Sequence, residues 1–277
     1  MITHPNVKIN LGLHILSRRP DGFHNLETLF VPYFGISDTL EIVPAEDGKF
    51  DIEIIKEGGV GWNPQSDLTV RAYQLLHDEF GIPPVKIRLE KTSPVGAGLG
   101  GGSSDAAFAL RMLSDLFVLK LDDALLASYA ARLGSDCPFF IYNRPMLGRG
   151  RGDELSPFDI SSILEGYEIR VIAPEDISVS TAEAYSGIIP RERTPQDSLE
   201  AILAGGVSTW PHRLENDFEQ SVFAKYPTLA DIKQSLYDEG AAYASLSGSG
   251  SALFALFASE GFTAGKAEGI VDFLGLA

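Results

Sequence analysis

The sequence from residue 94 to residue 107 reads Pro94-Val95-Gly96-Ala97-Gly98-Leu99-Gly100-Gly101-Gly102-Ser103-Ser104-Asp105-Ala106-Ala107. From Ala106 onward, apolar residues recur at helical spacing as far as Phe117. Before the loop, residues 85–90 alternate apolar and charged side chains, as a half-buried strand does. The order is therefore strand, glycine loop and helix, and Ser103 or Ser104 is expected to be the helix N-cap. Glycines let the backbone approach a ligand closely and a helix N-terminus attracts anions, so the loop is predicted to bind phosphate.

Other glycine-rich segments fit this stretch less well. A Walker A loop requires a lysine near its end, and no lysine lies between Gly96 and Ser104. Residues 96–101 match the Gly-x-Gly-x-x-Gly fingerprint of dinucleotide-binding proteins. That fingerprint opens the first βαβ unit of its domain, whereas these residues come well inside the chain. A flexible linker rarely leads directly into a capped amphipathic helix. A phosphate loop is therefore the favoured interpretation.

The composition restricts the kinds of partner that this protein is expected to bind. The net charge of −16 argues against general binding to nucleic acid or to anionic membranes, because both need a basic face. The single cysteine, Cys137, excludes a disulfide within the chain. No apolar run approaches the roughly twenty residues that span a bilayer, and the N-terminus does not resemble a signal peptide. We therefore expect a cytoplasmic protein that binds neither membrane nor nucleic acid.

The glycine stretch resembles the phosphate loop of the GHMP kinases. Its long Gly-Leu-Gly-Gly-Gly-Ser-Ser form is similar to one branch of that family, which phosphorylates a cytidine diphosphate-linked polyol. The resemblance implies a two-domain α+β fold. It implies a nucleotide-binding domain over residues 1–150, like domain 2 of ribosomal protein S5, and a ferredoxin-like, substrate-side domain over residues 151–277.

Three further motifs support the resemblance and suggest catalytic residues. Residues 6–15 alternate, which by itself indicates a strand with a solvated polar face. They resemble the first family motif, which implies that Lys8 is catalytic and that Asn10 contacts the substrate. Asp136, alone in a turn before a proline, would be structural, but Gly134–Phe140 resembles the family motif that holds the catalytic acid/base. Residues 244–256 read as a hairpin and resemble the third motif, a backbone shelf beside the substrates.

A second set of residues resembles the cytidine-binding positions of the same branch. Phe23 and His24 follow a Pro-Asp-Gly turn, with Phe23 where tyrosine is usual. Thr181 and Tyr185 match a substrate-side element in which phenylalanine is known at the position of Tyr185. The resemblance implies that cytosine stacks between Phe23 and Tyr185 and that His24 reads its edge.

The resemblance also implies the nucleotide site and the metal. ATP is the expected co-substrate and Mg²⁺ the expected metal, with Ser104, or else Ser103, supplying the hydroxyl ligand. Asp67 stands where the family has an asparagine, so it is expected to be only an N-cap. Asp105 places negative charge beside the expected anion site, which conflicts with phosphate binding there. The expected ATP-binding residues are Lys91, Pro94, Val95, Gly96, Ala97, Gly98, Leu99, Gly100, Gly101, Gly102, Ser103 and Ser104.

The expected function is ATP-dependent phosphorylation of a hydroxyl on a cytidine diphosphate-linked polyol in the non-mevalonate isoprenoid pathway. One alternative is a sister GHMP kinase such as homoserine kinase, which is not expected to carry the Phe23-His24 element. The other is a nucleotide-binding regulator without catalysis, against which the retention of Lys8 and Asp136 speaks. A monomer or a weak homodimer is expected.

Overall fold

The computed structural model describes residues 1–259, which fold into two compact units that both contain helices and strands. One unit holds residues 1–7, 33–95 and 100–144, and the other holds residues 8–32, 96–99 and 145–259. The expected α+β class is confirmed. The two units interleave along the chain, and the division into domains at residue 150 stays a prediction. The last part of the expected second domain, residues 260–277, lies outside the described residues.

The first unit is built on a four-stranded sheet with the order β1-β4-β6-β5. β4 runs antiparallel to β6, whereas β5 runs parallel to it. The two strands that flank the turn at residues 46–48 are therefore not neighbours, because β6 lies between them. The strands are β1 (Ile2–Thr3), β4 (Thr39–Pro44), β5 (Asp51–Lys56) and β6 (Val85–Lys91).

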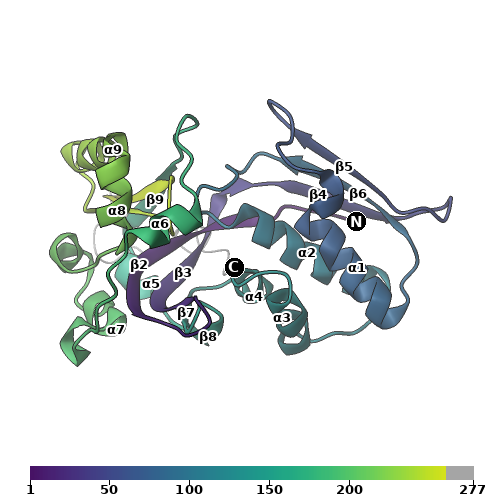
Figure 1. Cartoon of the computed structure of the whole chain (residues 1–277), viewed down its shortest axis with the longest axis horizontal. Coiled ribbons are helices and arrows are strands. Elements are labelled where there is room, and N and C mark those ends of the chain that lie inside the picture. The colour runs from purple at the N-terminus through teal and green to yellow at the C-terminus, as the bar shows by residue number, and fades with distance from the viewer. Residues whose placement is uncertain (260–277) are drawn as a thin grey trace. The chain divides into compact units, whose positions relative to one another are not determined.

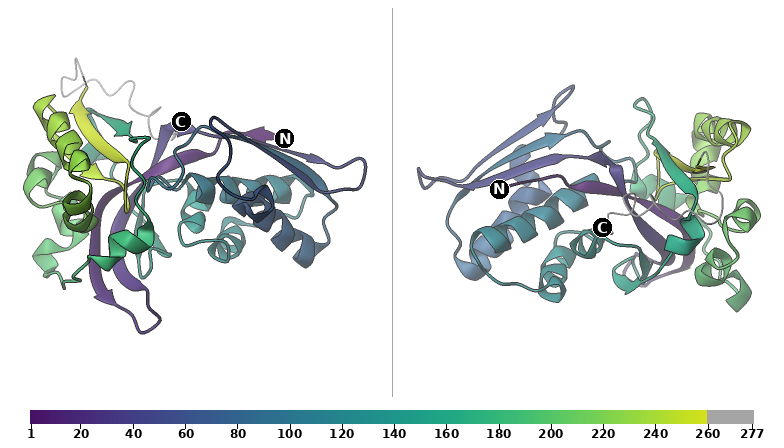
Figure 2. Two further views of the ribbon diagram at one scale, coloured as in Figure 1. Left: turned by 45° about the horizontal axis from the view of Figure 1, so that its top comes forward. Right: turned by 180° about the vertical axis from the view of Figure 1, so that it is seen from behind.

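Helices α1 and α2 lie side by side on one face of this sheet (Figures 1 and 2). Local signals set the limits of α1, because Asp67 caps its N-terminus and Gly81 ends it in the left-handed conformation. α2 is the helix expected after the glycine loop, and α4 packs against it. The helices of this unit are the 3₁₀ turn η1 (Pro64–Ser66), α1 (Leu68–Phe80), α2 (Gly101–Leu116), α3 (Asp123–Ala131) and α4 (Cys137–Tyr142).

The second unit contains residues of one four-stranded sheet and a complete three-stranded sheet. The four-stranded sheet has the order β2-β3-β7-β8, and the three-stranded sheet has the order β10-β11-β9. The hairpin expected over residues 244–256 is confirmed, since β10 pairs antiparallel with β11. The strands are β2 (Asn6–Arg18), β3 (His24–Ser37), β7 (Met146–Arg149), β8 (Glu154–Pro157), β9 (Tyr167–Ile172), β10 (Tyr243–Leu246) and β11 (Leu253–Ala258).

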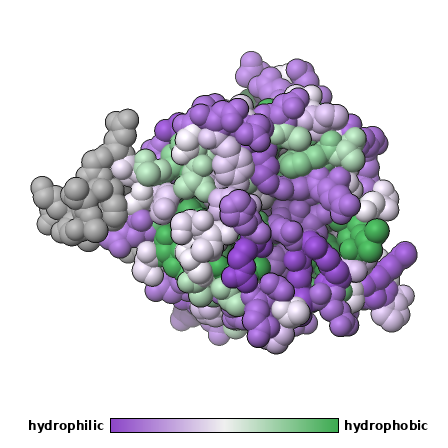
Figure 3. All heavy atoms as spheres, turned by 90° about the vertical axis from the view of Figure 1, so that its left-hand side faces the viewer, coloured by the Kyte–Doolittle hydropathy of each residue, from purple (hydrophilic) through white to green (hydrophobic). Residues whose placement is uncertain are grey.

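Helices cover the three-stranded sheet of this unit (Figure 1). Leu229 and Leu236 of α9 and Phe218 of α8 are buried in one apolar cluster with Leu246 and Leu253 of the sheet. The outer face over these helices is largely hydrophilic, with apolar residues in small separate groups (Figure 3). The helices of this unit are α5 (Ser161–Leu164), α6 (Thr181–Ser186), η2 (Pro195–Asp197), α7 (Leu199–Leu203), η3 (Val207–His212), α8 (Phe218–Lys225) and α9 (Pro227–Asp238).

Within residues 1–259, none of the helices combines the length and the apolar character needed to cross a bilayer.

Candidate active site

The glycine loop adopts backbone conformations that favour glycine. Gly96, Gly98 and Gly100 have φ angles of +71°, +79° and +73°. Gly100 is the N-cap of α2, and no side chain closes the first turn of this helix. The prediction that Ser103 or Ser104 is the N-cap is therefore wrong, because the glycines extend the helix upstream of both serines. The uncapped N–H groups of the first turn are suited to bind an anion.

The third motif contacts the glycine loop within the second unit. The Ser247 hydroxyl donates to the Gly98 carbonyl at 3.1 Å, and the Ala252 N–H donates to the Ala97 carbonyl at 3.0 Å. A Cβ atom at Gly98 would collide with the Ser247 carbonyl oxygen, so only glycine allows this close approach. The turn between β10 and β11 thus supports residues 97 and 98 through one backbone and one side-chain hydrogen bond.

Lys8 and Asn10 are buried side by side on β2. The Lys8 side chain donates from Nζ to the Asn10 Oδ1 at 2.5 Å and to the Gly98 carbonyl at 2.7 Å. The Asn10 amide donates to the Thr28 hydroxyl at 3.0 Å. Lys8 is only 3% exposed and Asn10 is 2% exposed, so the alternative of a solvated polar face is wrong. These contacts hold a cationic side chain beside the glycine loop.

Lys91 takes part in a buried polar network of the first unit. Its ammonium donates to Asp38 at 2.5 Å, to Asp105 at 2.7 Å and to the Ser93 hydroxyl at 3.0 Å. Burial opposes the charge on Lys91, but the two carboxylates outweigh it and raise its pKa. The Asp105 side chain is thus bonded to Lys91, which resolves the conflict noted in the sequence.

Asp136 lies at the start of α4 and is half-buried. It occupies the N-cap position but makes no capping hydrogen bond, so helix capping does not account for this carboxylate. Burial raises the pKa of the adjacent Cys137 thiol to about 12, so this side chain acts as a small buried hydrophobe. Lys8 belongs to the other unit, and the catalytic pairing of Lys8 with Asp136 stays a prediction.

The residues of α2 fit a magnesium ion in their chemistry. The Ser104 hydroxyl is buried and has no hydrogen-bond partner among the described residues, and hydroxyl oxygen is a hard ligand of the kind Mg²⁺ prefers. No cluster of three or more His, Cys, Asp or Glu side chains within residues 1–259 could hold a metal by itself. A magnesium ion here would therefore depend on nucleotide phosphates for most of its ligands.

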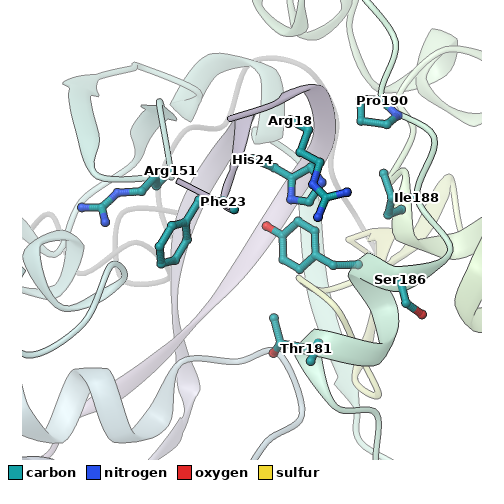
Figure 4. A pocket seen from close by; sticks show the side chains of 11 residues that line it. Arg18, Phe23, His24, Arg151, Thr181, Ser186, Ile188 and Pro190 are labelled. Carbon is teal, nitrogen blue, oxygen red and sulfur yellow. The ribbon is translucent and has the colours of Figure 1, made fainter. Parts of the chain in front are cut away.

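A pocket of about 660 Å³ in the second unit brings together the residues expected to recognise cytidine (Figure 4). Phe23, His24, Thr181 and Tyr185 all line it, although they come from distant parts of the sequence. The rings of His24 and Tyr185 are stacked with centroids 4.7 Å apart and an angle of 17° between their planes. Phe23 is 55% exposed, so its side chain is accessible to a ligand in the pocket.

Two arginines of this pocket were missed by the sequence reasoning. The Arg151 guanidinium lies 5.3 Å from the centre of the Phe23 ring and forms an ion pair with Asp153. Arg18 lies near His24 in the same view (Figure 4) and lines the same pocket. Burial and the positive charge of Arg18 together lower the pKa of His24, which favours the neutral imidazole. No pattern in the sequence distinguishes these arginines from ordinary surface cations.

The remaining expectations concern the edge of the nucleotide site. Asp67 accepts from the Thr69 N–H at 2.9 Å and from the Trp62 indole at 3.0 Å, which confirms it as an N-cap. Val95 is exposed and Pro94 is half-buried, and no contact in the described residues assigns either of them to a nucleotide. Their part in ATP binding stays a prediction.

Two family models match the chain. The GHMP kinases N terminal domain matches residues 67–144, and the GHMP kinases C terminal model matches residues 198–273. The first match ends where the chain passes from one compact unit to the other.

Relatives of high identity carry one name. A protein of Bacteroides fragilis named 4-diphosphocytidyl-2-C-methyl-D-erythritol kinase is 49% identical over 261 residues, which are 94% of this chain and 93% of that protein. A protein of Cytophaga hutchinsonii with the same name is 45% identical over 257 residues, 93% of this chain and 92% of its own length.

Solved structures agree with these relatives. A crystal structure of 4-(cytidine 5'-diphospho)-2C-methyl-D-erythritol kinase matches with a TM-score of 0.73 and 33% identity, over 92% of this chain and 90% of that chain. A crystal structure of mevalonate kinase matches with a TM-score of 0.68 at 14% identity, over 93% of this chain and 91% of that chain, which shows a shared fold.

Proposed function

This chain belongs to the GHMP kinases, in the branch of the 4-diphosphocytidyl-2-C-methyl-D-erythritol kinases, and on that premise we propose the reaction that it catalyses. It uses ATP to phosphorylate a hydroxyl of 4-diphosphocytidyl-2-C-methyl-D-erythritol, giving the 2-phosphate and ADP, in the non-mevalonate isoprenoid pathway. The observation that carries this proposal is the near-full-length identity of 49% to a relative of that name. The pocket that gathers Phe23, His24 and Tyr185 supports it independently.

In the proposed mechanism, the glycine loop and the first turn of α2 hold the phosphates of ATP. Their N–H groups and the helix dipole neutralise part of the phosphate charge. A magnesium ion, held by the phosphates and the Ser104 hydroxyl, would supply further charge neutralisation. The chain's own contribution is mainly to position the groups, as phosphoryl transfer requires.

Asp136 and Lys8 are the proposed catalytic residues. Asp136 accepts the proton of the attacking hydroxyl while the bond from that oxygen to the γ-phosphorus forms and the bond to ADP breaks. Lys8, fixed by Asn10 and the Gly98 carbonyl, stabilises the charge on the transferred group. Asn10, which touches Lys8 directly, is proposed to contact the substrate.

Cytosine recognition is proposed to depend on stacking and on one edge contact. The exposed side chain of Phe23 and the ring of Tyr185 provide aromatic surfaces, while Thr181 lines the same pocket. Stacking accepts any base, so the choice of cytosine has to come from hydrogen bonds at the base edge. Neutral His24 can both donate and accept such bonds, which suits it to this role.

The experiment that tests the function measures ADP release with Mg²⁺ and three acceptors: the cytidine substrate, its uridine analogue and homoserine. We expect efficient turnover of the cytidine compound alone. Turnover of homoserine would favour the sister kinase, and ATP binding without any turnover would favour a regulator. Equal use of the cytidine and uridine compounds would contradict the proposed recognition.

Two variants test the residues. Asp136→Asn is expected to lower kcat by about 10²- to 10⁴-fold, since the proton acceptor is lost, and to leave the Kd for ATP nearly unchanged. Phe23→Ala is expected to raise the KM of the cytidine substrate about 5- to 150-fold, because a base–aromatic stack is worth roughly 1–3 kcal/mol. Near-normal turnover by Asp136→Asn would remove that residue from the mechanism.

We further propose that the protein acts in the cytoplasm, as the single cysteine suggests. Its partners are then ATP and the cytidine diphosphate-linked polyol. A monomer or a weak homodimer stays the expected state.

A further inference from the structure

Four polar side chains of the first unit form one buried network on both sides of the glycine loop. Lys91 and Ser93 precede the loop, and Asp105 follows it in the second turn of α2. Asp38 stands before β4 and receives hydrogen bonds from both of the residues that precede the loop. We call Asp38, Lys91, Ser93 and Asp105 the loop network.

The loop network ties the two ends of the loop together. Lys91 bridges Asp38 at 2.5 Å and Asp105 at 2.7 Å, with both ion pairs almost completely buried. The second oxygen of Asp38 accepts from the backbone N–H groups of Thr92 and Ser93, each at 2.7 Å. The strand that enters the loop and the helix that leaves it are thus attached to one ammonium group.

The network also fixes the start of α2. A Cβ atom at Gly101 would collide with the Ser93 hydroxyl and would lie 3.3 Å from the Lys91 ammonium. The first helical residue therefore packs directly on the network, without a side chain between them. A displacement of Lys91 or Ser93 would move the N–H groups that the phosphates need.

The position of Lys91 argues against direct contact with a nucleotide. Only 3% of its side chain is exposed, and three oxygen atoms already accept from its ammonium, which has three protons to donate. Contact with a phosphate would break one of two buried ion pairs and leave a carboxylate without its partner.

We propose that Lys91 is a positioning residue, which with Asp38 and Asp105 holds both ends of the glycine loop in place for the phosphates of ATP. This inference rests on the proposed function, in that the loop is taken to bind ATP. It assigns to Lys91 a different role from the nucleotide contact implied by the family resemblance.

The carboxylates of Asp38 and Asp105 differ in how many of their oxygens accept hydrogen bonds. Asp38 accepts hydrogen bonds on both of its oxygens, two of them from backbone N–H groups. Asp105 has one oxygen on Lys91 and a second, buried oxygen without a partner among the described residues. Asparagine at position 105 keeps an acceptor for Lys91 and removes the excess negative charge, so Asp105→Asn is the conservative variant.

The test compares Lys91→Met, Asp105→Leu, the double variant and Asp105→Asn. Each is titrated with a non-hydrolysable ATP analogue by calorimetry, and its folding is checked by thermal unfolding. Lys91→Met and Asp105→Leu are each expected to weaken analogue binding about 10- to 100-fold, because the loop is displaced. The double variant is expected to be no weaker than the poorer single variant, because both changes remove one interaction. Asp105→Asn is expected to stay within about threefold of the wild type.

A second readout distinguishes positioning from contact. Amide hydrogen exchange of residues 94–102 without nucleotide is expected to be faster in Lys91→Met and Asp105→Leu than in the wild type or Asp105→Asn. If Lys91 contacts the nucleotide itself, Lys91→Met alone weakens binding and exchange is unchanged, which would overturn the inference. Should Lys91→Met not fold, Asp105→Leu against Asp105→Asn decides the question by both readouts.

Failure of the proposed function gives a different result. In that case the wild type does not bind the ATP analogue, or binds it and turns over no cytidine substrate. Analogue binding needs no acceptor, so the role of Lys91 is measured independently of the acceptor's identity. A wild type that binds the analogue and a folded Lys91→Met variant that binds it equally well would disprove only the positioning role.

Discussion

At the scale of single residues, His14 shows how burial controls chemistry. It lies on β2 with 0% exposure, and neither ring nitrogen has a hydrogen-bond partner among the described residues. Burial lowers its pKa from 6.5 to about 4, and the charge of Arg193 acts in the same direction. Between pH 6.5 and about pH 4, the unfolded chain therefore binds a proton that the folded chain does not bind.

This difference predicts a loss of stability in acid. Because the pKa of His14 is lower in the folded state, the stability that it contributes is present above pH 6.5 and falls as the pH drops toward 4. The full loss of folding stability is roughly 3 kcal/mol, because each pH unit between the two pKa values corresponds to about 1.4 kcal/mol. His14→Phe is expected to lose that much less stability than the wild type between pH 7 and pH 4, as measured by urea unfolding. The exposed His4, changed to Gln, is the control, and parallel pH profiles of wild type and His14→Phe would contradict the prediction.

The same strand shows what the sequence could not reveal about single residues. The alternation over residues 6–15 correctly predicts a strand, and resemblance singles out Lys8 and Asn10. Neither the alternation nor the resemblance reveals that the polar face of this strand is buried as well. The residues that cover this face, such as Gly98, are distant in the sequence. Arg18 could not be found either, because its place in the pocket depends on how residues 18–24 and 181–190 meet.

At the scale of elements, local sequence signals predict where some helices begin and end. The two ends of α1 follow from Asp67, which caps its N-terminus, and from Gly81, which ends it, and both effects are local. The start of α2 was not predictable in this way. Glycine occurs both in loops and at helix ends, so the segment itself does not indicate where the helix begins. In the structure, Gly101 is helical and packs against Ser93, which lies outside the segment. Pairing of β5 with β6 is likewise a tertiary outcome that no local signal encodes.

Glycines of the loop should therefore respond to substitution in different ways. Gly98→Ala introduces a Cβ against the Ser247 carbonyl at a positive φ, so the free energy of unfolding is expected to fall by about 1–3 kcal/mol. Gly102→Ala is the matched control, because its Cβ meets no atom within 4 Å and its φ is ordinary. Chemical denaturation of the two variants measures the contrast, and equal stability would disprove the close packing of loop and shelf.

A bulkier residue at Gly102 tests phosphate binding by the loop. Gly102 is exposed in the first turn of α2, so Gly102→Val is expected to fold and to obstruct the uncapped N–H groups. The Kd for ATP should rise about 10- to 100-fold, as the loss of one or two charge-assisted hydrogen bonds implies. Gly101→Val is less informative, because its side chain collides with Ser93 before any nucleotide is bound. Unchanged ATP affinity in folded Gly102→Val would remove this loop from the nucleotide site.

At the scale of the whole molecule, charge poses a problem for a kinase of anionic substrates. The chain has a net charge of −16 and therefore repels nucleotides at long range. Binding then depends on local positive charge, which the loop supplies through N–H groups and the aromatic pocket through arginines. Arg151 is partly neutralised by Asp153, so Arg18 is the pocket cation from which we expect the larger effect.

This reasoning predicts a specific effect of Arg18→Gln. The KM of the cytidine diphosphate substrate is expected to rise about tenfold, since a hydrogen bond to a charged group contributes roughly 1.5–3 kcal/mol. The KM of ATP and kcat are expected to stay unchanged, because Arg18 does not belong to the glycine loop or the catalytic pair. Salt screens exposed charges over about 8 Å at physiological ionic strength, so the wild-type KM should rise with salt more steeply than that of the variant. Steady-state kinetics between low and high salt measure both effects. If the two salt dependences are the same, the charge of Arg18 does not contribute to substrate binding, and the pocket recognises its ligand through stacking and base-edge contacts alone.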